Sequence, residues 1–187
     1  MQKKKSKMIT FEIEVPEQIE IILEKDKISM KKNSKEITRE INPLISLSKD
    51  KNKILLSTNE SRRENKRLLG TTKSHLKNMI DGITNGFEYE LEICNVHFPM
   101  TVTYDKTKGE FTIKNMLGER VPRIIKTSNP NKIEVEIKPP HIKIRSHDLE
   151  LAGQTAANLE KLTRIRNRDR NKFQDGIFII KKPGQET

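Results

Sequence analysis

The stretches LLGTTKSHLKNM (68–79) and LAGQTAANLEKL (151–162) carry leucine, glycine, threonine and leucine at the same relative places. The matching residues lie 83 positions apart in all three cases: Gly70 and Gly153, Thr72 and Thr155, Leu76 and Leu159. The segment ISMKK, from Ile28, precedes FTIKN, from Phe111, by the same offset. Because one offset holds over several separate segments, we predict a tandem duplication within the chain.

Both stretches lie within amphipathic helical patterns, which we place at 59–83 and 147–165. Asn59 or Ser61 is the candidate N-cap of the first predicted helix, and Ser146 or Asp148 that of the second. The apolar stripe of the first consists of Leu68, Leu69, Thr72, Leu76, Met79, Ile80 and Ile83, and that of the second of Leu149, Ala152, Ala156, Leu159 and Leu162.

Short segments with period-two alternation surround these helices. They are ITFEIEV (9–15), IEIIL (19–23), ISMKK (28–32), ITREI (37–41), FEYELEI (87–93), VHFPMTVTY (96–104), EFTIKNML (110–117), RVPRIIK (120–126), KIEVEIK (132–138), HIKIR (141–145) and GIFII (176–180). Such alternation between polar loops predicts antiparallel strands with one solvent-facing side. We therefore predict an α+β fold of two tandem duplicated domains, 1–83 and 84–187, each a small antiparallel sheet with a packed helix.

The charge composition favours a polyanionic partner. Lys and Arg total 37 against 26 Asp and Glu, which gives a formal net charge of +11. Either nucleic acid or an acidic membrane surface fits this excess. Aromatic residues make up only 4% and Trp is absent, so stacking on unpaired bases is an unsuitable main binding mode. Folded or double-helical nucleic acid, held by its phosphates, fits better.

Neither a membrane protein nor an enzyme is expected. No apolar run approaches the roughly 20 residues that span a bilayer, and the basic start MQKKKSK is not followed by the apolar region of a secretory signal. The single cysteine, Cys94, excludes an internal disulfide. The four histidines lack the spacing of a helical metal pair, and no phosphate-binding loop is present. We expect no metal, no cofactor and no small-molecule substrate.

The strongest functional feature is the run KLTRIRNRDRNKFQDGIFIIKK (161–182). Its arginines occupy every second position from Arg164 to Arg170, and Asp169 is the one acidic residue within 161–172. On an extended chain such arginines would follow one edge about 6.6–6.8 Å apart, a spacing comparable to that of consecutive phosphates. Each guanidinium offers two parallel donors to a phosphate.

Several other conformations of this run stay open. It could be a disordered basic tail or a solvated helix face, and a short helical turn at 168–173 would spoil the one-edge geometry. The apolar segment 177–180 favours a run held between two packed elements, hence a fixed docking surface. On the first helix, cations of the N-terminal turn either are solvated or meet phosphate. The predicted RNA-binding residues are Arg62, Arg63, Lys66, Arg164, Arg166, Asn167, Arg168, Arg170, Lys172, Lys181 and Lys182.

Five segments resemble the universal large-subunit ribosomal protein six family, called protein nine in eukaryotes. They are SHLKNMIDGITNGFEYELE (74–92) for its domain-joining segment, VHFPMTV (96–102) and KNMLGERVPRI (114–124) for its second-domain strands, DLELAGQTAANL (148–159) for its second helix and RNRDRNKFQDGIFI (166–179) for its C-terminal signature. The resemblance covers almost the whole chain and is strongest over about 70–182. The C-terminal form is that of the archaeal and eukaryotic branch.

This resemblance implies a structural protein of the cytoplasmic large ribosomal subunit, which binds rRNA near the stalk base and the factor-binding region. Neighbouring ribosomal proteins, including those of the stalk base, are the other implied partners. The implied rRNA contacts are Arg166, Asn167, Arg168, Lys172 and the neighbourhood of Asp175 and Gly176. A free RNA-binding assembly or regulatory factor is the alternative.

The chain also departs from the family pattern. Asn171 stands where the family commonly has arginine, Arg170 replaces an apolar residue and Phe178 replaces a usual tyrosine. The first domain resembles the family more weakly, with shortened loops between Asn42 and Asn59.

Overall fold

The computed structural model describes residues 9–24, 27–33, 35–50, 52–58, 62–169 and 171–184. The chain divides into two compact units that meet between Asn85 and Gly86. This division lies two residues beyond the boundary of 83/84 expected from the sequence, and the assignment of two domains stays a prediction. In the described ranges, no helix is both long and apolar enough to cross a membrane.

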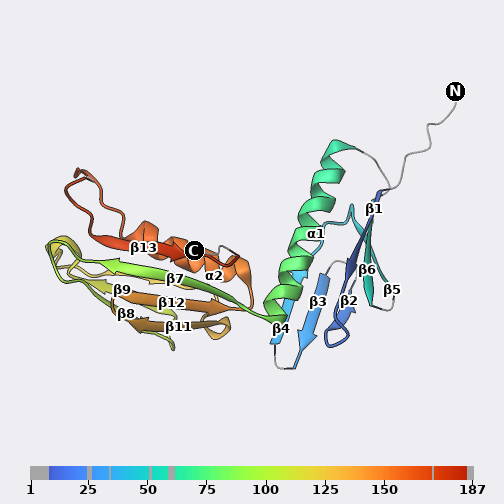
Figure 1. The fold of residues 1–187 in the computed structure, drawn as a ribbon, viewed down its shortest axis with the longest axis horizontal. Helices are drawn as coiled ribbons and strands as arrows, with labels where there is room; N and C mark the ends of the chain where they lie inside the picture. Colours follow the sequence, from blue (N-terminus) through green and yellow to red (C-terminus); the bar gives the residue numbers. More distant parts are fainter. Residues whose placement is uncertain are drawn as a thin grey trace. The chain divides into compact units, whose positions relative to one another are not determined.

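The described residues of the first unit form six strands and one long helix, α1 (Figure 1). In chain order they are β1 (Ile9–Glu14), β2 (Glu20–Leu23), β3 (Lys27–Lys32), β4 (Lys35–Glu40), β5 (Ser46–Asp50), β6 (Lys53–Thr58) and α1 (Arg63–Thr84). The strands form two antiparallel sheets, with the orders β1-β6-β5 and β2-β3-β4. Helix α1 packs against β1, β3, β4 and β6, and its buried stripe includes Leu69, Leu76 and Ile83.

The second unit repeats this order and adds one strand. Its elements are β7 (Phe87–Cys94), β8 (Thr101–Asp105), β9 (Glu110–Lys114), the short 3-10 helix η1 (Met116–Gly118), β10 (Arg123–Lys126), a second one, η2 (Pro130–Lys132), β11 (Ile133–Lys138), β12 (His141–Ser146), α2 (Leu149–Leu162) and β13 (Gly176–Lys181). The sheet orders are β10-β9-β8 and β11-β12-β7-β13. Helix α2 packs against β7, β12 and β13, and also contacts β10.

The two units share one topology. Strands β7 to β12 occupy the sheet positions of β1 to β6, and β13 adds an antiparallel partner on the other edge of β7. Equivalent residues also form the same hydrogen bond. The hydroxyl of Thr72 donates to the Leu68 carbonyl at 2.9 Å, and the hydroxyl of Thr155 donates to the Leu151 carbonyl at 2.8 Å. The duplicated α+β fold is thus confirmed, although each unit has two sheets where one was predicted.

One strand pair lies in a region that the sequence analysis treated as loops. Between Asn42 and Asn59, the chain forms the hairpin of β5 and β6. Ile54, Leu56 and Thr58 of β6 are almost completely buried, and they alternate with less buried neighbours. Leu55 between them is also apolar and Thr58 is polar, so the segment KILLST shows no period-two alternation in the sequence.

The helix N-termini differ from each other. Asp148 caps α2, as predicted, because its carboxylate accepts from the backbone N–H of Glu150 and Leu151 at 2.9 and 3.4 Å. At α1 the N-cap is Arg62, and no side-chain capping bond is present there. The predicted caps Asn59 and Ser61 lie outside the described residues.

Candidate nucleic-acid interface

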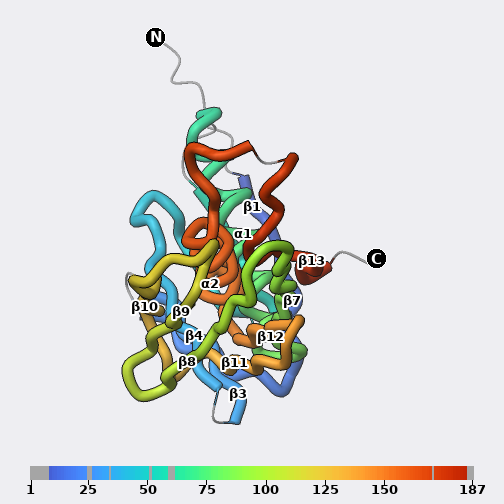
Figure 2. The backbone as a smooth tube through the Cα atoms, turned by 90° about the vertical axis from the view of Figure 1, so that its left-hand side faces the viewer, coloured from blue at the N-terminus to red at the C-terminus, as the bar shows by residue number. Residues whose placement is uncertain are grey.

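The end of α2 is tied directly to the start of β13. Thr163, the C-cap residue of α2, is 2% exposed. Its hydroxyl oxygen accepts from the backbone N–H of Ile177 at 2.9 Å, and the hydroxyl lies 3.3 Å from the Leu159 carbonyl, to which it donates. The two ends of the segment between α2 and β13 therefore lie next to each other. Figure 2 shows it as a long excursion from the body of the second unit.

A buried carboxylate holds the returning end of this segment. Asp175 is 3% exposed and accepts the backbone N–H of Val96 at 2.8 Å and of His97 at 2.9 Å. The Nδ1 of His97 lies 2.6 Å from its other oxygen, and it donates because an ionised carboxylate can only accept. Burial raises the pKa of Asp175, but the hydrogen bonds from His97 and Val96 outweigh burial and lower it from 3.8 to about 2.

A stack of side chains continues from this anchor into the basic run. The ring of Phe173 stacks on the ring of His97, with 4.8 Å between centroids. The guanidinium of Arg168 lies over the ring of Phe173, 4.9 Å from its centroid. Cation–π contacts of this kind favour a defined side-chain position. Thus Arg168 is connected to buried Asp175 through two rings.

The run is folded and is not an extended edge. In its described residues no strand lies between α2 and β13. Asn167 has a left-handed backbone with φ of 59°, and the Asp169 carbonyl accepts from the N–H of both Lys172 and Phe173 at 3.2 and 3.0 Å. The one-edge geometry was wrong, and the short turn that was its alternative is present. Arg170 lies outside the described residues.

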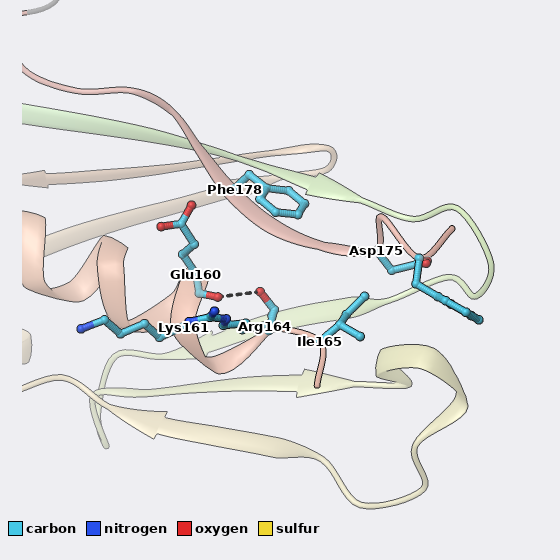
Figure 3. A pocket seen from close by; sticks show the side chains of 8 residues that line it. Glu160, Lys161, Arg164, Ile165, Asp175 and Phe178 are labelled. Atoms are coloured by element: carbon cyan, nitrogen blue, oxygen red, sulfur yellow. Dashed lines mark hydrogen bonds between the residues drawn. The ribbon is translucent and has the colours of Figure 1, made fainter. Parts of the chain in front are cut away.

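An open pocket of about 430 Å³ separates this segment from α2 and β13. Figure 3 shows Lys161 on the last turn of α2 and Arg164 just beyond the end of that helix, whereas Glu160 points toward β13. The Glu160 carboxylate lies 3.5 Å from the backbone N–H of Ile179. Because Glu160 and Asp175 supply carboxylates to its lining, this pocket is less suited to an anion than the hollow beside it.

The second hollow, of about 410 Å³, collects the cations; we call it the cationic hollow. Its lining residues are Leu117, Glu119, Arg123, Lys161, Leu162, Arg164, Ile165, Arg166 and Arg168. Five of them are cations and one is a carboxylate. The structure thus brings together Arg164, Arg166 and Arg168 of the predicted set, in spite of the turns between them.

Arg123 and Glu119 form a fixed wall of this hollow. Two nitrogens of Arg123 donate to the two carboxylate oxygens of Glu119, and a third donates to the Leu162 carbonyl at the end of α2. Hydrogen bonds from Arg123, assisted by its charge and that of Arg168, lower the pKa of Glu119. Glu119 is therefore ionised at neutral pH, and Arg123, to which it is bound, joins the chain before β10 to the end of α2.

Sequence reasoning missed this wall. Arg123 lies 39 residues before Leu162, and only the folded chain brings the two together. The one available signal was that Arg123 follows Arg39 by 84 positions, nearly the offset of the duplication, and this marked a repeated strand without indicating a site.

The remaining predicted residues are placed elsewhere. Arg62 is the N-cap of α1, while Arg63 and Lys66 lie in its first turn; all three are exposed residues of the first unit. Asn167 and Lys172 are exposed and belong to the same segment as the hollow, without lining it. Lys181 ends β13 and Lys182 follows it, both exposed.

Known proteins include relatives of this chain. No family model matches the chain. Large ribosomal subunit protein uL6 of Methanobrevibacter smithii is 41% identical over 172 residues, which cover 91% of this chain and 94% of that protein. The proteins of the same name from Nanoarchaeum equitans and Haloarcula marismortui are 36% and 35% identical, over 95% and 93% of this chain and 95% and 96% of their own lengths.

This chain belongs to the uL6 family. The resemblance drawn from its sequence segments is confirmed, including the archaeal branch. Membership of the uL6 family also agrees with a non-enzymatic role, because its members are constituents of a ribosomal subunit. Among the residues that the structure describes, His, Cys, Asp and Glu side chains nowhere gather in threes as a metal site would require.

Proposed function

We propose that this chain is a structural constituent of the cytoplasmic large ribosomal subunit, in which fixed cations of the second unit hold folded rRNA by its phosphates. The uL6 relatives carry the large-subunit role in their names. Phosphate contacts position a protein on RNA, and recognition then depends on the shape of the folded RNA.

The observation that carries this proposal is the anchoring of the basic run at both ends. Thr163 binds Ile177 at one end, and Asp175 binds Val96 and His97 at the other. Arginine side chains on such an anchored segment lose less conformational freedom on binding than those on a loose tail. Tight, shape-dependent binding of RNA is therefore favoured over weak electrostatic attraction.

Two finer statements rest on the family resemblance. We place the chain near the stalk base and the factor-binding region, with stalk-base proteins among its neighbours. We also assign a second RNA contact to the N-terminal turn of α1, where Arg62, Arg63 and Lys66 are exposed. Anions are stabilised at this end of a helix by its dipole, which supports a phosphate there.

A free assembly or regulatory factor is the second candidate, and sedimentation separates the two. We predict that the wild-type chain stays with the large subunit through a high-salt sucrose gradient, in about stoichiometric amount. The variant Arg166→Glu with Arg168→Glu should fold but remain at the top of the gradient, because both residues are exposed and line the cationic hollow.

Lys106→Glu with Lys108→Glu is the matched control. Both lysines are exposed in the turn between β8 and β9 of the same unit, and the change in charge is identical. This control should incorporate like the wild type. Normal incorporation of the arginine variant would refute the site, and release of the wild type as salt rises would favour the transient factor.

A further inference from the structure

The cationic hollow has more positive charge than one phosphate can balance. Glu119 pairs with Arg123, which leaves four cations around a space of about 410 Å³: Lys161, Arg164, Arg166 and Arg168. Within the described part of the chain, neither Lys161, Arg164 nor Arg166 forms an ion pair with a carboxylate. A phosphodiester carries one negative charge, so several phosphates must come close together to neutralise this site.

The helix end beside the hollow carries too little charge to change this conclusion. The C-terminal end of α2 lies at its edge and presents carbonyl oxygens, which oppose an anion. A helix end is equivalent to about half an elementary charge, against the four uncompensated cations. One of those carbonyls, that of Leu162, is already satisfied by Arg123. The hollow thus remains an anion site with a net excess of positive charge.

The walls give the hollow a fixed shape. Arg123 joins the chain before β10 to the end of α2 through three hydrogen bonds, and Arg168 is fixed against Phe173. Leu117, Leu162 and Ile165 supply apolar surface along which the aliphatic parts of the arginines can lie. A fixed cluster of cations selects a ligand whose phosphates are already close to each other.

We propose that the cationic hollow binds the phosphates that face each other across the narrow major groove of an A-form RNA helix. The major groove of A-form RNA is deep and narrow, so phosphates of its two strands approach each other there. In B-form DNA the same groove is about 12 Å wide. This inference rests on the proposed function, which it deepens by naming the RNA shape that the site takes.

The test compares an RNA duplex with a DNA duplex of the same sequence and length. The affinity of the full-length chain for each is measured at several salt concentrations. The variant is Lys161→Gln with Arg164→Gln, two exposed residues of the hollow, and the control is Lys106→Gln with Lys108→Gln. On the RNA duplex, the slope of log affinity against log salt should fall by about 1.4–1.8, because each lost phosphate contact contributes about 0.7–0.9.

On the DNA duplex the hollow variant should change the slope no more than the control does. An equal fall on both duplexes, or no fall on either, would overturn the inference. Arg166→Glu with Arg168→Glu separates the two levels of the argument. Suppose that this variant weakens RNA binding, but that the Lys161→Gln, Arg164→Gln variant lowers the salt slope no more on RNA than on DNA. In that case only the groove assignment fails. If neither variant affects RNA binding, the proposed function fails as well.

Discussion

At the scale of single residues, Asp175 illustrates how a charge inside the fold positions charges outside it. The family resemblance placed the neighbourhood of Asp175 at the rRNA, yet its carboxylate is buried and accepts three hydrogen bonds from the β7–β8 connection. We therefore propose that it acts on RNA binding through the segment that it anchors. His97 serves twice, as a donor to Asp175 and as a stacking partner for Phe173.

We predict that Asp175→Asn destabilises the chain by about 1–3 kcal/mol at pH 6, because charge-assisted hydrogen bonds to a buried group are lost. The wild-type pKa is lower in the folded state than the ordinary 3.8. The ionised carboxylate thus stabilises the fold above about pH 4, and this stabilisation disappears as the pH falls toward about 2.

Urea unfolding at pH 6 and near pH 2 checks this prediction. The difference between wild type and Asp175→Asn should shrink at the lower pH. The control Glu134→Gln removes an exposed carboxylate from β11 and should change stability little. A variant that is as stable as the wild type at pH 6 would show that Asp175 does not anchor the segment.

At the scale of elements, the two duplicated helices differ in how closely other side chains pack around one equivalent glycine. In α2 a Cβ atom at Gly153 would lie 2.8 Å from the hydroxyl oxygen of Tyr89 and 3.2 Å from its Cζ. In α1 nothing lies within 4 Å of a Cβ atom at Gly70. The small residue is thus required by packing in the second unit only.

Alanine substitution should have unequal effects at these two positions. Gly70→Ala should stabilise by about 0.5–1 kcal/mol, because alanine favours the helix and meets no neighbour. Gly153→Leu should destabilise by about 1–3 kcal/mol through overpacking, and Gly153→Ala should gain less than Gly70→Ala because Tyr89 must move. Thermal melting of the full-length variants measures both, and an equal gain from alanine at the two glycines would contradict the packing difference.

The elements also show which features a sequence can predict. Periodicity is local, so the long strands and both helices were predicted, and Asp148 was one of the two caps expected for the second helix. The hydrogen bonds of Asp175 join residues 78 and 79 positions apart, and no local pattern announces them. The alternating arginines suggested an extended edge, but tertiary anchors and the turn at Asp169 decided the conformation instead.

At the scale of the whole molecule, the net charge of +11 does not by itself locate the RNA site. The four-stranded sheet of the second unit carries matched charges. Arg145 lies in register between Glu134 and Glu88, and Lys143 lies in register between Glu136 and Glu90. Cations there are matched by carboxylates across neighbouring strands. In the cationic hollow the cations outnumber the carboxylates by four. We therefore propose that unmatched charge, rather than total charge, marks the surface for RNA.

Crosslinking of the assembled large subunit tests the central claim, that an anchored cationic segment holds folded rRNA. Peptides that span 163–176 should carry crosslinks to a few fixed rRNA positions, since the segment is tied at Thr163 and Asp175. Peptides from the charge-matched strands β11 and β12 should carry few. Crosslinks spread evenly over all exposed lysines and arginines, or absent from 163–176, would contradict the account.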